Sequence, residues 1–174
     1  MADLEQRYRA LSRQFHPDYF YNAPAAERRA SLEQSSYLND AYRTLKNPIS
    51  RIEYLLQLEG MGPKGPEQAS KQVPPALLEE VFALNEELDE IRGMRQSGAP
   101  AESWTLRLQR ARTPIEAKRA DHEAQLQELS TRWDSAVDDG ERRTILQSLR
   151  ERFLERNYIN NLLAGIEREL VADT

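Results

Sequence analysis

The residues best able to do chemistry here are two histidines and the carboxylates near them. His16 and Asp18 flank Pro17 and could form an acid–base pair. His122 could in principle join a di-iron bundle, but no glutamate stands three residues before it, as such sites require. The chain has no cysteine, which excludes disulfides, thiolate zinc sites and iron–sulfur clusters held by its own thiolates. We therefore expect no metal and no cofactor.

Composition narrows the class of protein further. Charged residues make up 30% of the chain and hydrophobic residues 39%, and no eighteen apolar residues run together. The net charge is −5, and residues 1–57 carry a slight positive excess, so the negative charge lies in the rest. An acidic chain with no basic cluster is a poor nucleic-acid binder. With no apparent secretory signal, we expect a cytoplasmic protein that contacts neither membrane nor nucleic acid and whose partners are proteins.

Helical periodicity fills the chain, and Pro and Gly separate its segments. We predict an all-α fold in two parts, with a proline- and glycine-rich linker at 59–75 between a hairpin domain at 1–58 and an antiparallel three-helix bundle at 76–171. The predicted helices cover residues 3–15, from beyond Pro24 to about 45, a shorter stretch after Pro48, 75–96, 102–137 and 141–171.

The sequence His16-Pro17-Asp18 follows a helix with a basic face. Leu4, Tyr8, Leu11 and Phe15 form its apolar stripe, and the other faces carry Arg7, Arg9 and Arg13. Proline disfavours helical backbone in the residue before it, so the helix should end at His16. The tip of a hairpin is convex and open to water, which argues against an enzyme. The tripeptide is either a polar surface turn or a loop that binds a partner.

A second pattern lies within residues 75–92. On a wheel of about 100° per residue, one core stripe contains Leu77, Val81, Leu84, Leu88 and Ile91. Leu78 and Phe82 lie roughly 100–140° away from this stripe, next to Glu79, Glu86 and Glu90. Such an apolar pair rimmed by carboxylates is either a protein-binding patch or a surface that packs on the linker or the hairpin.

These segments resemble a known family. The runs LSRQFHPDYF and LNDAYRTLKNPISRIEYLL are similar to the J-domain of DnaJ-class proteins. The later runs EELDEI and RFLERN narrow the resemblance to the HscB (Hsc20-type) co-chaperones of iron–sulfur cluster assembly, from about residue 3 to 171. The resemblance implies a non-enzymatic adaptor that stimulates the ATPase of a DnaK/HscA-class chaperone and delivers an iron–sulfur cluster scaffold protein to it. A general J-domain adaptor or a helical scaffold with no iron–sulfur role is the alternative.

The resemblance also implies two sets of site residues. The chaperone would meet the loop His16-Pro17-Asp18, with Arg7 and Arg13 and additionally Arg9. Alternatively, these arginines are a solvated helix face. The scaffold would meet a surface made of Leu78, Glu79, Phe82, Ala83, Glu86, Glu90 and Phe153.

Two of these positions depart from the family pattern, which has methionine where this chain has Glu79 and glutamate where it has Ala83. A third, Phe153, lies only about 40° from Leu149 on its own helix, so a packing role is equally open for its ring. The anchor of the scaffold surface is therefore expected to differ in detail.

J-domains also begin with a short apolar helix ahead of the basic one, whereas this chain starts inside the basic helix. We then expect the apolar stripe from Leu4 to Phe15 to lack the packing that this first helix would provide. Each large side chain left exposed forfeits roughly 1.5–3 kcal/mol of burial, so we expect a weakened hairpin.

Overall fold

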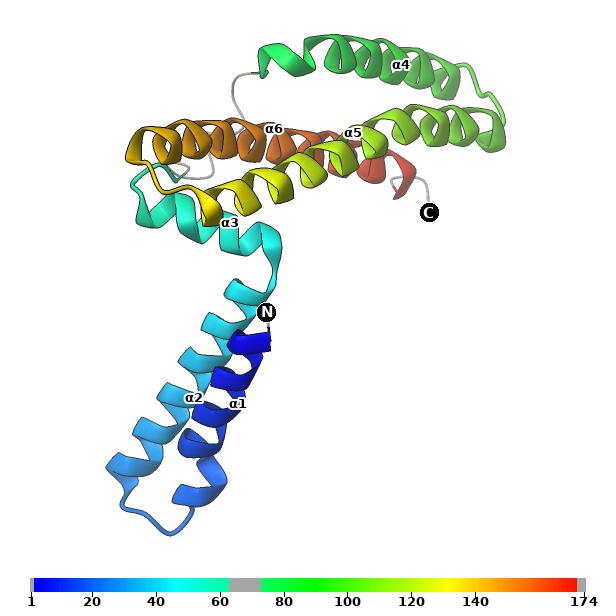
Figure 1. The fold of residues 1–174 in the computed structure, drawn as a ribbon. Coiled ribbons are helices and arrows are strands. Elements are labelled where there is room, and N and C mark those ends of the chain that lie inside the picture. Colours follow the sequence, from blue (N-terminus) through cyan, green and yellow to red (C-terminus); the bar gives the residue numbers. More distant parts are fainter. Residues whose placement is uncertain (1, 63–72, 172–174) are drawn as a thin grey trace. The chain divides into compact units, whose positions relative to one another are not determined.

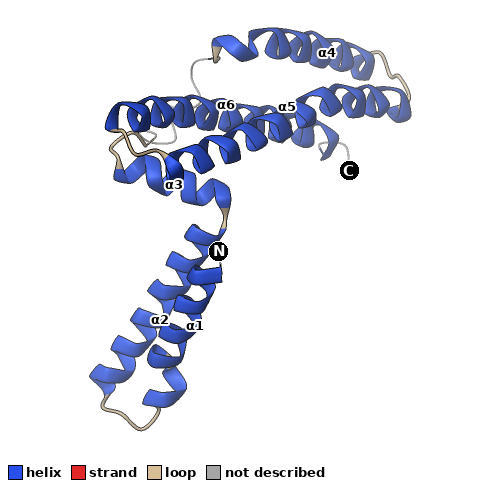
Figure 2. Cartoon of the chain, in the orientation of Figure 1, coloured by secondary structure: helices blue, strands red, loops and turns tan. Residues whose placement is uncertain are grey.

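The computed structural model describes residues 2–62 and 73–171, and these residues form helices with no strand among them (Figures 1 and 2). The predicted all-α class is confirmed. The α-helices are α1 (Ala2–Phe15), α2 (Ala25–Lys46), α3 (Pro48–Leu58), α4 (Leu78–Gln96), α5 (Ala101–Ser135) and α6 (Asp139–Val171); short 3-10 helices cover Pro17–Phe20 and Pro75–Leu77. No helix in the described ranges is long and apolar enough to cross a membrane.

The chain divides into two compact units, Met1–Leu55 and Leu56–Thr174, and α3 runs across the division. Residues 63–72, the greater part of the predicted linker at 59–75, lie outside the described residues. The three-part division of the chain stays a prediction.

Prolines and short polar side chains set the helix ends. His16, before Pro17, has extended backbone (φ −63°, ψ 127°), so α1 stops at Phe15 as predicted. Asn47 begins α3, because its Oδ1 accepts hydrogen bonds from the backbone N–H groups of Ile49 and Ser50 at 2.9 and 3.1 Å. Gly98 takes a left-handed φ of 75° in the turn that follows α4.

In the first unit, α1 and α2 form a hairpin (Figure 1) held by specific contacts. The Tyr8 ring stacks on Tyr42 with centroids 4.0 Å apart, and the Tyr8 hydroxyl donates to Asn39 Oδ1 at 2.7 Å. No residue of α1 is buried, and Leu11 is 40% exposed. The apolar stripe is therefore only partly covered.

The second unit is the predicted antiparallel three-helix bundle. Glu80 and Glu87 of α4 pair with Lys118 and Arg107 of α5, so the two helices run in opposite directions. Glu123 and Glu167 likewise show that α5 and α6 are antiparallel, since they pair with Arg156 and Arg112. One core cluster of the bundle comprises Leu77, Val81, Leu84, Ile91, Trp104, Leu108, Ile115, Ile159 and Ile166.

Replacing Leu149 by alanine should lower the free energy of unfolding of the bundle by about 2–5 kcal/mol, because its side chain is fully buried. Urea unfolding followed by tryptophan fluorescence measures this unit selectively, since Trp104 and Trp133 both lie in α5. Leu106→Ala removes a 48% exposed leucine of α5 and is the matched control. Equal losses for the two variants would contradict this account of the core.

Candidate functional site

The HPD loop, His16-Pro17-Asp18, closes on itself. The Asp18 N–H donates to His16 Nδ1 at 3.3 Å, which requires an unprotonated Nδ1 and leaves the ring proton of a neutral imidazole on Nε2. The Asp18 side chain is 86% exposed and that of His16 49% exposed. The loop therefore offers an accessible N–H and an accessible carboxylate to a partner.

Contacts to α2 set the position of this loop. The buried Ser31 hydroxyl donates to the Phe15 carbonyl at 2.9 Å, immediately before the loop. The Tyr19 N–H donates to the His16 carbonyl at 3.1 Å and closes the short 3-10 turn. The loop thus has a defined shape before any partner binds, which lowers the entropy lost on binding.

Next to the loop, α1 presents the predicted arginines. Arg7, Arg9 and Arg13 are all exposed, and two of them pair within the helix: Arg7 with Asp3 at 3.1 Å and Arg9 with Glu5 at 2.6 Å. Exposed pairs of this kind contribute only about 0–1 kcal/mol. A partner carboxylate can therefore replace the internal one at little cost, although a solvated face would have the same geometry.

Sequence reasoning missed two tyrosines beside the loop. Tyr19 is 74% exposed and Tyr21 78% exposed, and the Tyr19 ring lies edge-on to His16 with centroids 6.0 Å apart. The available signal was the aromatic run directly after Asp18, in a segment with no helical stripe to bury it. Exposed tyrosines are common in binding surfaces.

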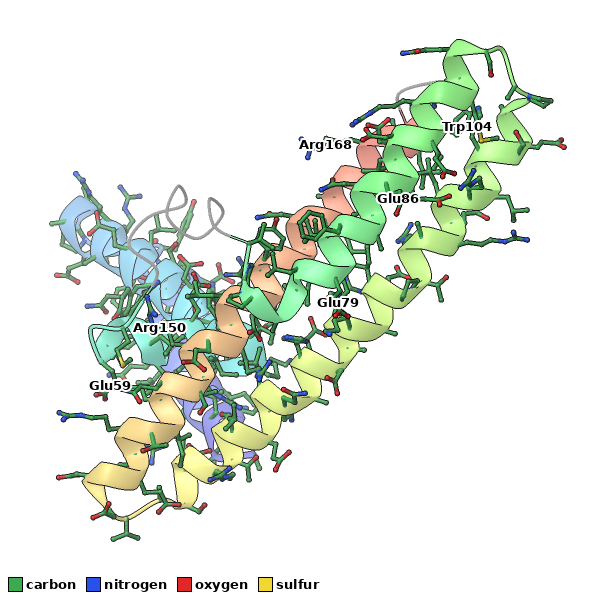
Figure 3. The ribbon with its side chains drawn as sticks, turned by 90° about the horizontal axis from the view of Figure 1, so that it is seen from above. Glu59, Glu79, Glu86, Trp104, Arg150 and Arg168 are labelled. Atoms are coloured by element: carbon green, nitrogen blue, oxygen red, sulfur yellow. The ribbon has the colours of Figure 1, made fainter. Side chains whose placement is uncertain are left out.

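The second candidate surface, the α4 patch, consists of Leu78, Glu79, Phe82, Ala83, Glu86 and Glu90, which are all exposed. Phe82 is 70% exposed and Leu78 41% exposed, whereas Leu77 is fully buried. The helical wheel therefore correctly placed Leu78 and Phe82 on the exposed side of α4 and Leu77 on the core side. The alternative prediction, that Leu78 and Phe82 pack on the linker, involves residues 63–72, which lie outside the described residues. Glu79 and Glu86 mark the course of the patch along α4 in Figure 3.

The carboxylates of α4 fall into two groups. Glu87 and Glu90 both accept hydrogen bonds from the Arg107 guanidinium of α5. These two hydrogen bonds raise the pKa of Arg107, and the bond to Glu87 has the larger effect. Among the described residues, no cation lies within ion-pair distance of Glu79 or Glu86. Glu90 thus helps to join two helices, while Glu79 and Glu86 face solvent.

Phe153 does not belong to the α4 patch. Its side chain is only 2% exposed, so the ring is part of the interior of the bundle and cannot offer an exposed surface to a scaffold. Its position close to Leu149 on the α6 wheel, which is also buried, is the physical reason. This burial favours the packing alternative for Phe153.

His122 is a structural residue. It is 2% exposed, and its Nδ1 and Nε2 contact the Lys118 carbonyl at 2.9 Å and Glu155 Oε2 at 3.0 Å. Arg152 also pairs with Glu155, at 2.6 Å. This buried network joins α5 to α6 and presents no reactive group at the surface. In the described ranges no three His, Asp or Glu side chains are arranged to hold a metal ion.

An exposed HPD loop on a helical hairpin, followed by an antiparallel bundle, is the arrangement that the resemblance to J-domain co-chaperones implies. No model of a known protein family matches the chain. Over 68 residues the chain is 53% identical to the Co-chaperone protein HscB homologs of Neisseria gonorrhoeae (strain NCCP11945) and of Neisseria meningitidis serogroup A / serotype 4A (strain DSM 15465 / Z2491). The match covers 39% of this chain and 41% of each relative, and so spans about two fifths of their length.

Solved structures extend the likeness over the whole fold. Chaperone HscB from Vibrio cholerae superposes with a TM-score of 0.68 at 27% identity, covering 98% of this chain and 89% of that one. The human co-chaperone protein HscB gives a TM-score of 0.63 at 25% identity, covering 98% and 75%. The resemblance to the HscB co-chaperones is thereby confirmed, in sequence over one segment and in fold over nearly the entire chain. The names of these relatives describe chaperones or co-chaperones and not catalysts.

The ion pair between Glu80 and Lys118 should make the stability of the bundle depend on pH. The hydrogen bond from Lys118 lowers the pKa of Glu80 below its ordinary value of 4.5, against the opposing effect of burial. A carboxyl group with a depressed folded-state pKa stabilises the fold above its unfolded pKa, and this stabilisation is lost as the pH falls through the folded value.

Glu80→Gln should therefore be less stable than the parent at pH 7, and the difference should shrink below about pH 4. Urea unfolding across a pH series measures it, with Glu128→Gln on α5 as the control for an exposed carboxylate. A difference that stays constant from pH 7 to pH 3 would rule out the linkage.

Proposed function

We propose that this protein is a cytoplasmic co-chaperone that stimulates the ATPase of a DnaK/HscA-class chaperone and delivers an iron–sulfur cluster scaffold protein to it. This activity promotes the maturation of iron–sulfur proteins. The observation that carries the proposal is the pairing, in one chain of HscB-like fold, of an exposed HPD loop with an exposed apolar patch on α4. The two surfaces lie in different compact units, as an adaptor requires.

The chaperone would bind the first unit through the loop and the α1 arginines. The Asp18 carboxylate is 86% exposed, with one oxygen 3.5 Å from His16 Nδ1, and a chaperone arginine could bind it in a bidentate pair. The His16 Nε2–H is available as a donor. Arg7, Arg9 and Arg13 would steer an acidic chaperone face towards the loop and raise the rate of encounter. The hydrolysis itself would take place on the chaperone, so this chain contributes binding energy and orientation.

The scaffold would bind the second unit through the α4 patch. Phe82 and Leu78 supply a central apolar pair, and Glu79 and Glu86 beside it favour a partner with basic residues. An adaptor without an iron–sulfur role is the alternative, and it predicts no affinity for the scaffold. Any cluster would be carried by the scaffold, because this chain has no cysteine to hold one.

His16→Gln should abolish stimulation of the chaperone ATPase, because it removes the imidazole at the centre of the loop. Steady-state ATP turnover measures this, and binding of the scaffold by the same variant should be unchanged. Glu33→Gln, on the exposed surface of α2, is the control. Full stimulation by His16→Gln would show that the loop is an ordinary turn.

Leu78→Ala combined with Phe82→Ala should weaken scaffold binding by about one to several kcal/mol, the usual range for central apolar residues. Calorimetric titration of the scaffold measures the affinity, and circular dichroism checks that the helices persist. Leu106→Ala, an exposed leucine of α5 outside the patch, should bind normally. Unchanged affinity of the double variant would remove the patch from the proposed function.

A further inference from the structure

A groove of about 630 Å³ runs between α4 and α5, beside the α4 patch. It lies between two ion pairs that join these helices: Glu80 with Lys118 and Glu87 with Arg107. Glu87 lies seven residues after Glu80, which gives the groove a length of roughly 10 Å, at 1.5 Å of rise per residue. The two ion pairs join the helices at the two ends of this length.

Small side chains leave this space open. Ala83 of α4 and Ala111 of α5 line the groove midway between the two ion pairs, where neither reaches far across. Leu84 and Ile115 line it more deeply and are each only 4% exposed, since they belong to the core of the bundle. The surface of the groove is therefore mainly apolar and large enough for a bulky side chain.

Polar groups at the two edges of the groove differ in charge. Pro114 lines it and has no N–H, so the Arg110 carbonyl lacks the hydrogen bond it would otherwise receive in the helix. Glu79 lies on the α4 edge and the Arg110 guanidinium on the α5 edge. Neither has an oppositely charged side chain within ion-pair distance among the described residues. One edge is thus negative and the other positive.

Glu79 and Ala83 belong both to this groove and to the α4 patch, so the two surfaces are continuous. We infer that the α4–α5 groove is the second half of the scaffold-binding surface and receives a large apolar side chain of the scaffold protein between Ala83 and Ala111. A basic residue of the scaffold next to that side chain would face Glu79. This inference rests on the proposed function and adds α5 to the binding surface.

The charges at the edges favour this occupant. A Lys or Arg beside the inserted side chain would find a carboxylate with no internal partner, and an acidic or amide group on its other side would find Arg110. An apolar knob in a pocket, surrounded by polar contacts at the edge, is the usual arrangement of a binding hot spot.

Ala111→Trp tests the inference, because an indole at this position fills the groove and leaves Leu78 and Phe82 untouched. We expect at least a tenfold loss of affinity for an iron–sulfur scaffold protein, measured by calorimetric titration with the full chain. Ala124→Trp places the same side chain at an exposed position of α5 outside the groove, and should bind like the parent. Ala111→Met, a smaller filling, should give an intermediate loss even if the tryptophan variant is poorly folded.

The charged edge gives a second readout, since Glu79→Gln should reduce the dependence of scaffold affinity on salt. Normal binding by both Ala111 variants, together with weakened binding by Phe82→Ala, would overturn the groove and leave the proposed function standing. Normal binding by all of these variants would also overturn the inference, because the scaffold would then bind elsewhere on the chain. Failure of the parent protein to bind any iron–sulfur scaffold protein would overturn the proposed function itself. If Ala111→Trp changed only self-association in sedimentation, the occupant would be a second copy of this chain and the inference would be wrong.

Discussion

Burial of one apolar stripe of α4 is the constraint on which the second unit depends. Val81, Leu84 and Ile91 of α4 are buried in the core of the bundle, and this fixes the rotation of α4 about its axis. At 100° per residue, Phe82 must then point away from the core. Its exposure is a consequence of burying its neighbours and needs no separate explanation. The same rotation brings Ala83 to the groove beside α5.

The hairpin is not held together by a buried core stripe, because no residue of α1 is buried. Its geometry comes from a few directional contacts: the Tyr8 ring on Tyr42, the Tyr8 hydroxyl on Asn39, and the Ser31 hydroxyl on the backbone before the loop. Hydrogen bonds of this kind contribute about 0.5–1.5 kcal/mol each, less than a buried leucine. The loop therefore has a defined shape within a unit of modest intrinsic stability.

Much of this architecture could be predicted from the sequence, since local rules produce it. Pro17 ends α1, and the wheel of α4 correctly exposes Phe82. Features that depend on how one helix faces another could not be predicted. Glu90 proved to pair with Arg107 of α5, and the groove exists because small residues of two helices meet. These outcomes depend on the relative rotation and separation of helices, which periodicity within one helix does not encode.

The central claim is that one chain couples a chaperone to a scaffold, and steady-state ATP hydrolysis tests it most directly. The rate of a DnaK-class chaperone should be measured with this protein alone, with an iron–sulfur scaffold protein alone, and with both. The account predicts that this protein alone raises the rate of ATP hydrolysis. With both proteins present, the increase in rate should exceed the sum of the two separate increases, because a bound adaptor brings the scaffold to the chaperone. No stimulation by this protein, or purely additive increases, would contradict it.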